Sequence, residues 1–152
     1  GQYFDVVICN DSGLYFEELD FEDLRQPGLN IRTPMNRDRL SDEEMIDYYS
    51  KLITGLGGKV TAYYLDGIAV YNHGVISSFM DNMAAQKNGS FYMIDKASSK
   101  RFEGWPLDSL SINKENGKYF VDGSIEESKE NIIKDQYEKS VVDFLIKSLH
   151  IA

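Results

Sequence analysis

The sequence has very few of the residues that cross-link a chain or hold a transition metal. Its 152 residues include one cysteine, Cys9, and two histidines, His73 and His150. A single cysteine excludes an internal disulfide and any metal site built from several cysteines, and the two histidines lack metal-binding spacing. The acidic residues do not have the rhythm of a calcium loop. We therefore expect no metal and no cofactor.

Long hydrophobic runs and positive charge are also scarce. No apolar run approaches the roughly 18 residues of a membrane-spanning helix, so we predict no membrane partner. Lysine and arginine number 16 against 25 acids, which gives a net charge of −9 and disfavours direct binding to nucleic acid. The low cysteine content favours a cytoplasmic location, and secretion stays open because the chain starts at Gly1.

Turn signals in the middle of the chain predict a hairpin followed by a helix. Asp66-Gly67 separates two apolar runs, which favours strands over 60–65 and 68–72 joined by a type I′ turn. The apolar period then changes from two to about 3.6, which predicts a helix over 75–87.

A similar pattern opens the chain. Residues 3–9 are a strand candidate, the turn residues Asn10–Gly13 follow, and residues 14–19 are predicted to return as a second strand. Cys9 ends an apolar run of valine and isoleucine, so we expect it to be a buried, small hydrophobic residue and not a nucleophile.

Two capping boxes predict further helices. Ser41 and Glu44 frame a helix over 42–56, and a second box at Ser124 predicts a helix over 125–149. No repeat or linker interrupts the chain, so one domain over residues 1–152 is expected. The predicted fold class is α+β, a mostly antiparallel sheet built from hairpins with about three helices packed on it.

The charges are unevenly distributed along the chain. Residues 1–24 carry seven acids and no base, whereas residues 25–39 carry four arginines and one acid. An acidic segment suits a basic partner, and guanidinium groups suit an anion or a carboxylate. The alternative is a solvated surface whose arginines pair with nearby acids. The predicted partner-binding residues are Glu17, Glu18, Asp20, Glu22, Asp23, Arg32, Arg37 and Arg39.

Candidate catalytic residues form no complete motif. His73 could act as a base for Cys9, or for Ser77 or Ser78 beyond the expected strand-to-helix junction. The chain has no Gly-x-Ser-x-Gly elbow, and no third orienting residue can be named. No catalytic residue is therefore predicted.

Three hypotheses for function follow. The first is a non-enzymatic acidic protein of the inhibitor, immunity or antagonist type, which binds another protein with a basic surface. The second is a small hydrolase or transferase that uses His73 with Cys9 or with Ser77 or Ser78. The third is a structural or assembly subunit. The acidic first segment and the lack of a catalytic set favour the first, and the identity of the partner lies beyond the sequence.

Overall fold

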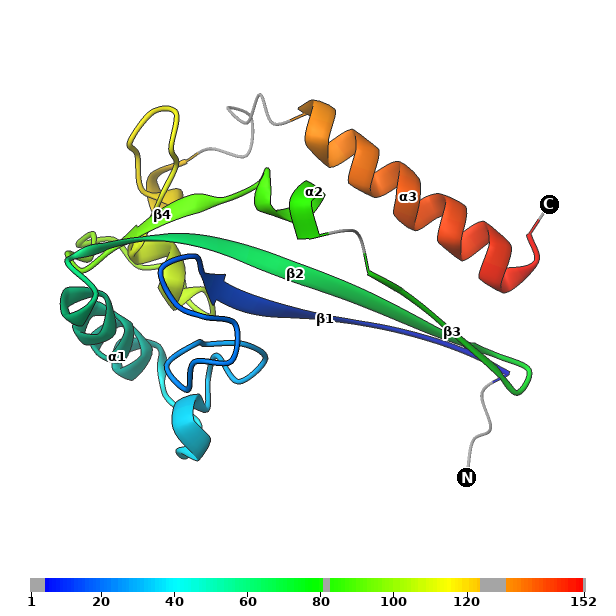
Figure 1. The fold of residues 1–152 in the computed structure, drawn as a ribbon, viewed down its shortest axis with the longest axis horizontal. Helices are drawn as coiled ribbons and strands as arrows, with labels where there is room; N and C mark the ends of the chain where they lie inside the picture. The colour runs from blue at the N-terminus through cyan, green and yellow to red at the C-terminus, as the bar shows by residue number, and fades with distance from the viewer. Residues whose placement is uncertain (1–4, 81–82, 124–130, 152) are drawn as a thin grey trace. The chain divides into compact units, whose positions relative to one another are not determined.

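A computed structural model describes residues 5–80, 83–123 and 131–151. Within these residues the structure has five strands, three α-helices and three short 3-10 helices. Figure 1 shows how the strands and α-helices follow one another along the chain. They follow the order β1 (Val6–Phe16), α1 (Asp42–Gly55), β2 (Lys59–Asn72), β3 (Val75–Met80), α2 (Met83–Lys87), β4 (Phe91–Ile94), β5 (Ser111–Ile112) and α3 (Asn131–Leu149). In the described part of the chain, no helix has the length and apolar character needed to cross a membrane.

The strands form one five-stranded sheet in the order β1-β2-β4-β5, with β3 paired to β2. The pairs β2–β3, β2–β4 and β4–β5 are antiparallel. The α+β class with an antiparallel sheet is therefore confirmed. The expectation of about three helices packed on the sheet is slightly off. Only α1 and α3 are long helices, because α2 has just five residues.

The chain divides into two compact units, and β1 and β2 each contribute residues to both. Unit 1 comprises residues 1–12, 65–89 and 128–152, and unit 2 comprises residues 13–64 and 90–127. Each unit is described separately below.

The predicted turn at Asp66-Gly67 is wrong, because β2 runs without interruption through both residues. The hairpin turn lies at His73-Gly74, where φ is 44° and 90° and Asn72 pairs with Val75. A type I′ turn needs positive φ at two successive residues, and His-Gly meets that need as Asp-Gly would.

The helix predicted over 75–87 is also wrong for most of its length. Residues 75–80 form β3, and only residues 83–87 are helical. The turn at His73-Gly74 brings residues 75–80 alongside β2. Backbone pairing along these six residues overrides an apolar pattern that suits a helix. Valine and isoleucine at the start of β3 fit this strand.

The predicted hairpin at residues 10–13 is absent, since β1 continues through them. Gly13 leaves room for a neighbouring ring: an added Cβ would lie 2.8 Å from Cε2 of Tyr15, so that ring would have to shift. The glycine therefore lets the Tyr15 ring fold back over the strand.

The predicted helix at residues 42–56 is confirmed as α1. The Ser41 amide donates to Oε2 of Glu44 at 2.8 Å, and the Glu44 amide donates to the Ser41 hydroxyl at 3.4 Å. The helix buries Met45, Tyr49 and Ile53 in the core of unit 2. That core is completed by residues of β1, β2, β4 and the segment 107–110.

In unit 1, α3 contacts β3. Phe79 and Phe144 stack with ring centroids 5.4 Å apart, and the Asn72 side-chain amide donates to the Ser148 carbonyl at 3.0 Å. The predicted helix over 125–149 is confirmed from residue 131 onward. Its predicted capping box at 124–127 lies outside the described residues.

Candidate functional site

The segment 25–40 of unit 2 lies between β1 and α1 in the chain, and hydrogen bonds hold it in place at several points. Leu14 and Gly28 exchange backbone hydrogen bonds of 3.0 and 2.8 Å. Further along, the Tyr49 hydroxyl donates to the Ile31 carbonyl at 2.8 Å, and the Leu40 amide donates to the Arg32 carbonyl at 2.8 Å. The middle of the segment is thereby held beside α1.

A cavity of about 490 Å³ lies between this segment and α1, and we call it the α1 cavity. Its volume is in the range of roughly 300–1,000 Å³ typical of small-molecule sites. Three cations, two carboxylates, one aromatic ring and three aliphatic side chains line it. The lining residues are Arg25, Met35, Arg37, Leu40, Glu44, Asp47, Tyr48, Lys51 and Leu52.

Most charges in the α1 cavity already have partners. Lys51 Nζ lies 2.6 Å from Oδ2 of Asp47 on the next turn of α1. Arg25 makes a two-pronged contact with Asp23, at 3.0 and 2.7 Å. Hydrogen bonds from the Arg25 side chain, and then from its backbone amide, lower the pKa of Asp23 to about 2. The Glu44 carboxylate accepts a hydrogen bond from the Ser41 backbone amide, and this bond is the main reason that the pKa of Glu44 is lowered.

Arg37 is the exception in the α1 cavity. Its guanidinium carbon lies 5.4 Å from the centroid of the Tyr48 ring, which is cation–π distance. Over the described ranges, its guanidinium has no ion pair and no hydrogen bond to protein. The five N–H donors of this group are therefore available to a ligand.

A strained turn positions Arg37. Met35 and Asn36 both adopt the left-handed conformation, with φ of 52° and 59°. Such conformations cost about 1–3 kcal/mol each for residues with a side chain, and they occur often at ligand-binding segments. The Arg37 amide closes the turn with a 3.1 Å hydrogen bond to the Pro34 carbonyl. Both Met35 and Arg37 line the α1 cavity as a result.

The structure places the eight residues predicted to bind a partner in different local environments. The Glu18 carboxylate accepts from the Thr61 amide at 2.7 and 2.9 Å, and Asp23 binds Arg25. Glu17, Asp20 and Glu22 are exposed to solvent. Two of the five acids are therefore held by hydrogen bonds, and three face solvent.

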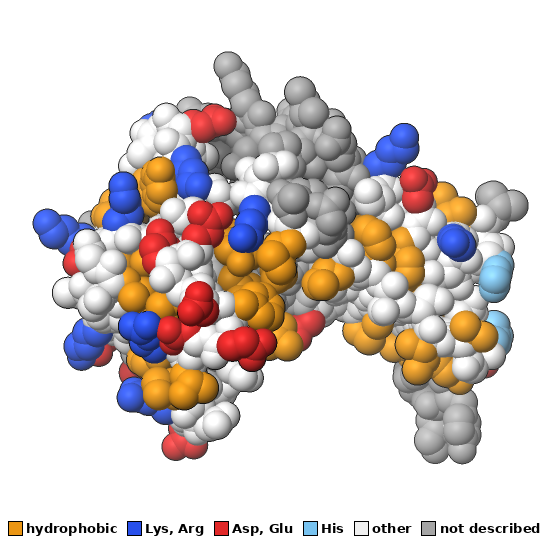
Figure 2. All heavy atoms as spheres, in the orientation of Figure 1, with side chains coloured by type: hydrophobic (Ala, Val, Ile, Leu, Met, Phe, Trp, Pro, Cys, Tyr) orange, Lys and Arg blue, Asp and Glu red, His pale blue; other side chains and the backbone are white. Residues whose placement is uncertain are grey.

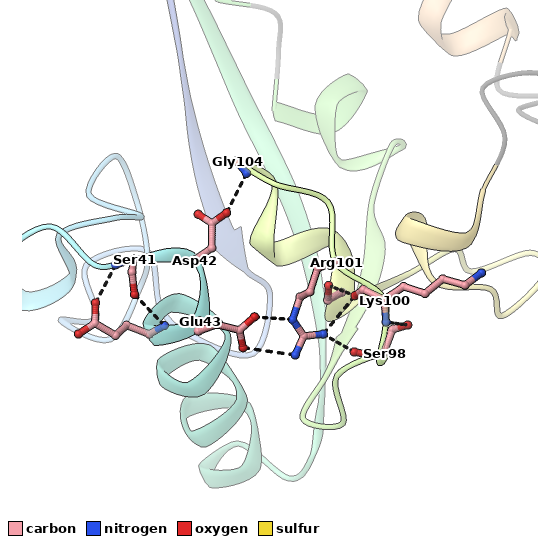
Figure 3. Close-up of polar contacts among 9 residues, drawn as sticks. Ser41, Asp42, Glu43, Ser98, Lys100, Arg101 and Gly104 are labelled. Atoms are coloured by element: carbon pink, nitrogen blue, oxygen red, sulfur yellow. Dashed lines mark hydrogen bonds and ion pairs between the residues drawn. The ribbon is translucent and has the colours of Figure 1, made fainter.

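The predicted arginines also have different environments. Arg32 donates to Asp42 at 2.9 Å and to the Gly104 carbonyl at 3.0 Å, so it links the segment to α1 and to the loop before residue 106. Asp42 also accepts from the Gly104 amide at 2.7 Å (Figure 3). That bond, followed by the one from Arg32, lowers the Asp42 pKa. Arg37 and Arg39 are both exposed, but only Arg37 lines the α1 cavity.

Figure 3 shows a further contact that fastens α1. Arg101 Nε donates to Oε1 of Glu43 at 2.7 Å, and this hydrogen bond raises the pKa of Arg101. Arg101 also donates to the Ser98 carbonyl at 2.5 Å. The contact with Glu43 anchors the N-terminal turn of α1, the helix that lines one side of the α1 cavity.

The proposed catalytic pairs are not formed. The His73 amide, at the hairpin turn, donates to the Asp5 carbonyl at 2.9 Å. Cys9 lies four residues after Asp5, which corresponds to roughly 13 Å at the rise of an extended strand. Ser77 and Ser78 pair with Val70 and Ala69, well away from the turn. Cys9 is exposed, so its expected burial is wrong.

A second polar region, in unit 1, was missed by sequence analysis. The Ser12 hydroxyl donates to the Asp66 carboxylate, and the Asp66 amide donates to Oε1 of Gln86 at 2.6 Å. A cavity of about 510 Å³ beside it is lined by Asn10, Asp66, Ile68, Glu138, Val141 and Val142. These residues lie on segments far apart in the chain, so no local motif could have revealed them. Among the described residues, no group of three or more His, Cys, Asp or Glu could hold a metal.

Comparisons with known proteins reveal similarity of fold. No family model and no curated protein matches the sequence. The Ham1 protein of Staphylococcus aureus matches 91% of this chain and 68% of its own, at 20% identity and a TM-score of 0.58. A Ham1 protein from Coxiella burnetii matches the same shares of the two chains at 13% identity and a TM-score of 0.58.

The third solved structure is a nucleoside-triphosphatase, or dITP/XTP pyrophosphatase, from Mycobacterium abscessus. It matches 90% of this chain and 63% of its own, at 12% identity and a TM-score of 0.59. At these identities the likeness shows the fold alone.

These comparisons contradict the hypothesis of an inhibitor, immunity or antagonist protein with a protein partner. The structures that share the fold include an enzyme named for its action on nucleotides. Charge imbalance in the first 24 residues was misleading because part of it is used in hydrogen bonds within the protein, such as those of Glu18 with Thr61 and of Asp23 with Arg25.

Proposed function

We propose that this protein is a small hydrolase that acts on nucleoside triphosphates and releases pyrophosphate. The observation that carries this proposal is the match of 90% of the chain to the Mycobacterium abscessus enzyme. At 12% identity, catalytic residues cannot be transferred from that enzyme to this chain. The proposal therefore requires that this chain itself has groups that bind a polyphosphate.

The α1 cavity contains residue types that suit such a substrate. Polyphosphate chemistry depends on positioning the anion and neutralising its charge, and guanidinium and ammonium groups do both. A nucleoside triphosphate carries Mg²⁺ with it, and proteins commonly hold that ion with one or two carboxylates in addition to the phosphates. Arg37 and Lys51 are cations of the cavity, and Glu44 and Asp47 are its carboxylates.

The direct test is product analysis. The purified chain is incubated with ITP, XTP, GTP or ATP in Mg²⁺, and nucleoside monophosphate, pyrophosphate and phosphate are quantified. We expect monophosphate and pyrophosphate in equal amounts, at least tenfold above the reaction without protein. Release of phosphate with diphosphate would show that a different bond is cleaved, and absence of turnover with every substrate would refute the proposal.

Two variants serve as controls for the discarded catalytic pairs. Cys9→Ser and His73→Ala remove the thiol and the imidazole, which the structure places apart on an exposed strand and a hairpin turn. Both variants should keep the wild-type rate. A loss of turnover in His73→Ala with unchanged folding would return attention to the hairpin.

A further inference from the structure

We infer that Arg37 in the α1 cavity binds a phosphate group, with Tyr48 as its positioning residue. The inference rests on the proposed function for the identity of the natural ligand, a nucleoside triphosphate. Its physical basis is separate, because it depends on the pairing and placement of the charges around the cavity.

The charges of the α1 cavity leave one cation available. Asp47 is paired with Lys51, Arg25 is paired with Asp23, and Glu44 accepts from Ser41. Among the cations of the lining, and within the part of the chain that the structure describes, Arg37 alone has no ion pair. An anion that reaches the cavity therefore finds one guanidinium that does not have to leave a carboxylate first.

Two features of the protein hold Arg37 in place before an anion binds. The left-handed turn at Met35 and Asn36 directs the chain back toward α1, and the Tyr48 ring lies under the guanidinium at 5.4 Å. A guanidinium over an aromatic ring keeps its N–H donors at its edge, where they can bind two oxygens of one phosphate. The Tyr48 ring packs against Tyr49 in a T-shaped arrangement, with ring centroids 5.1 Å apart and an interplanar angle of 88°. Less conformational freedom is therefore lost when the anion binds.

The chemistry of the rest of the lining limits the ligand class. Leu40, Leu52 and Met35 supply apolar surface beside the charged groups. A ligand with a phosphate and an apolar or aromatic part uses both kinds of surface, whereas inorganic pyrophosphate uses only the charged one. We therefore expect nucleoside triphosphate to bind more tightly than pyrophosphate, and the nucleoside alone to bind weakly.

The experiment compares two arginines of the same segment by calorimetry, with inorganic pyrophosphate and with ITP as probes. Arg37→Gln and Arg39→Gln change the net charge equally, but only Arg37 lines the α1 cavity. Arg37→Gln should weaken binding of both probes at least tenfold, and Arg39→Gln less than twofold. Equal losses would show a diffuse electrostatic attraction and overturn the inference, as would full affinity in Arg37→Gln. Thermal unfolding of both variants should match that of the wild type.

Tyr48 is tested by loss of its ring and by conservative rescue. Tyr48→Leu should weaken pyrophosphate binding about threefold, and Tyr48→Phe should retain wild-type affinity because the ring is kept. If both variants bind like the wild type, the ring does not position Arg37.

The outcomes separate this inference from the proposed function. Pyrophosphate release that survives Arg37→Gln unchanged would refute the inference and leave the function standing. Binding that depends on Arg37, without turnover of any nucleoside triphosphate, would refute the function and leave the anion site standing.

Discussion

The two units differ most in how their strands are covered. In unit 2, Leu14, Phe16, Tyr49 and Met93 are fully buried between the strands and α1. In unit 1, exposed apolar side chains gather around the end of the β2–β3 hairpin (Figure 2). Among them, Ile76 is 75% exposed.

The register of the hairpin explains the difference. Ile68 pairs with Phe79, and Phe79 stacks on Phe144 of α3, so this face of the hairpin is covered. Tyr71 pairs with Ile76, and side chains alternate between faces, so both point to the opposite side. One helix can cover only one face of a sheet. Burial in the described part of unit 1 is therefore one-sided, and the larger share of the stabilising burial lies in unit 2.

The largest expected effect tests that comparison directly. Leu14→Ala removes a fully buried side chain of unit 2 and should lower the free energy of unfolding by about 3 kcal/mol. Ile76→Ala removes an exposed side chain of unit 1 and should change it by less than about 0.5 kcal/mol. Urea unfolding of both variants measures the contrast. Similar losses of unfolding free energy in the two variants would contradict the comparison, because they would mean that Ile76 is buried.

High pH should weaken unit 2 through Tyr49. Burial, and then the nearby Tyr48 and Tyr64, raise the pKa of Tyr49. In the unfolded chain a tyrosine ionises near pH 10, so the stabilisation is complete below that pH and is lost as pH rises toward the folded pKa. Each pH unit above 10 should cost about 1.4 kcal/mol.

Urea unfolding between pH 9 and 11 measures the effect of Tyr49. Tyr49→Phe should flatten the alkaline fall while it lowers stability at neutral pH, because the hydrogen bond to Ile31 is lost. Tyr71→Phe, at an exposed position of unit 1, is the matched control and should keep the wild-type pH dependence. An alkaline fall that is unchanged in Tyr49→Phe would contradict the role of its burial.

The smallest effects compare two glycines of unit 1. Gly74 has φ of 90°, so Gly74→Ala should destabilise the protein by about 1 kcal/mol. Gly67 lies inside β2 with no positive φ and with open space where a Cβ would lie, so Gly67→Ala should stabilise by roughly 0.5 kcal/mol. Thermal unfolding gives both signs. The reverse pattern would place the turn at Asp66-Gly67.

Local interactions explain which parts of the fold were predictable. The helix α1 begins at its capping box and ends before Gly57-Gly58, and all the bonds that define these ends lie within a few residues. The sequence determined these features by itself, because no distant partner is needed to form them.

Tertiary structure decided the rest. Asp66-Gly67 and His73-Gly74 are both competent turns, and pairing of residues 67–72 with 75–80 selects the second. The same pairing converts a helical pattern into β3. The availability of Arg37 is decided in the same way: Arg25 and Arg32 find carboxylates, whereas Arg37 meets the Tyr48 ring in the α1 cavity. Such choices depend on contacts between distant residues, which no local pattern contains.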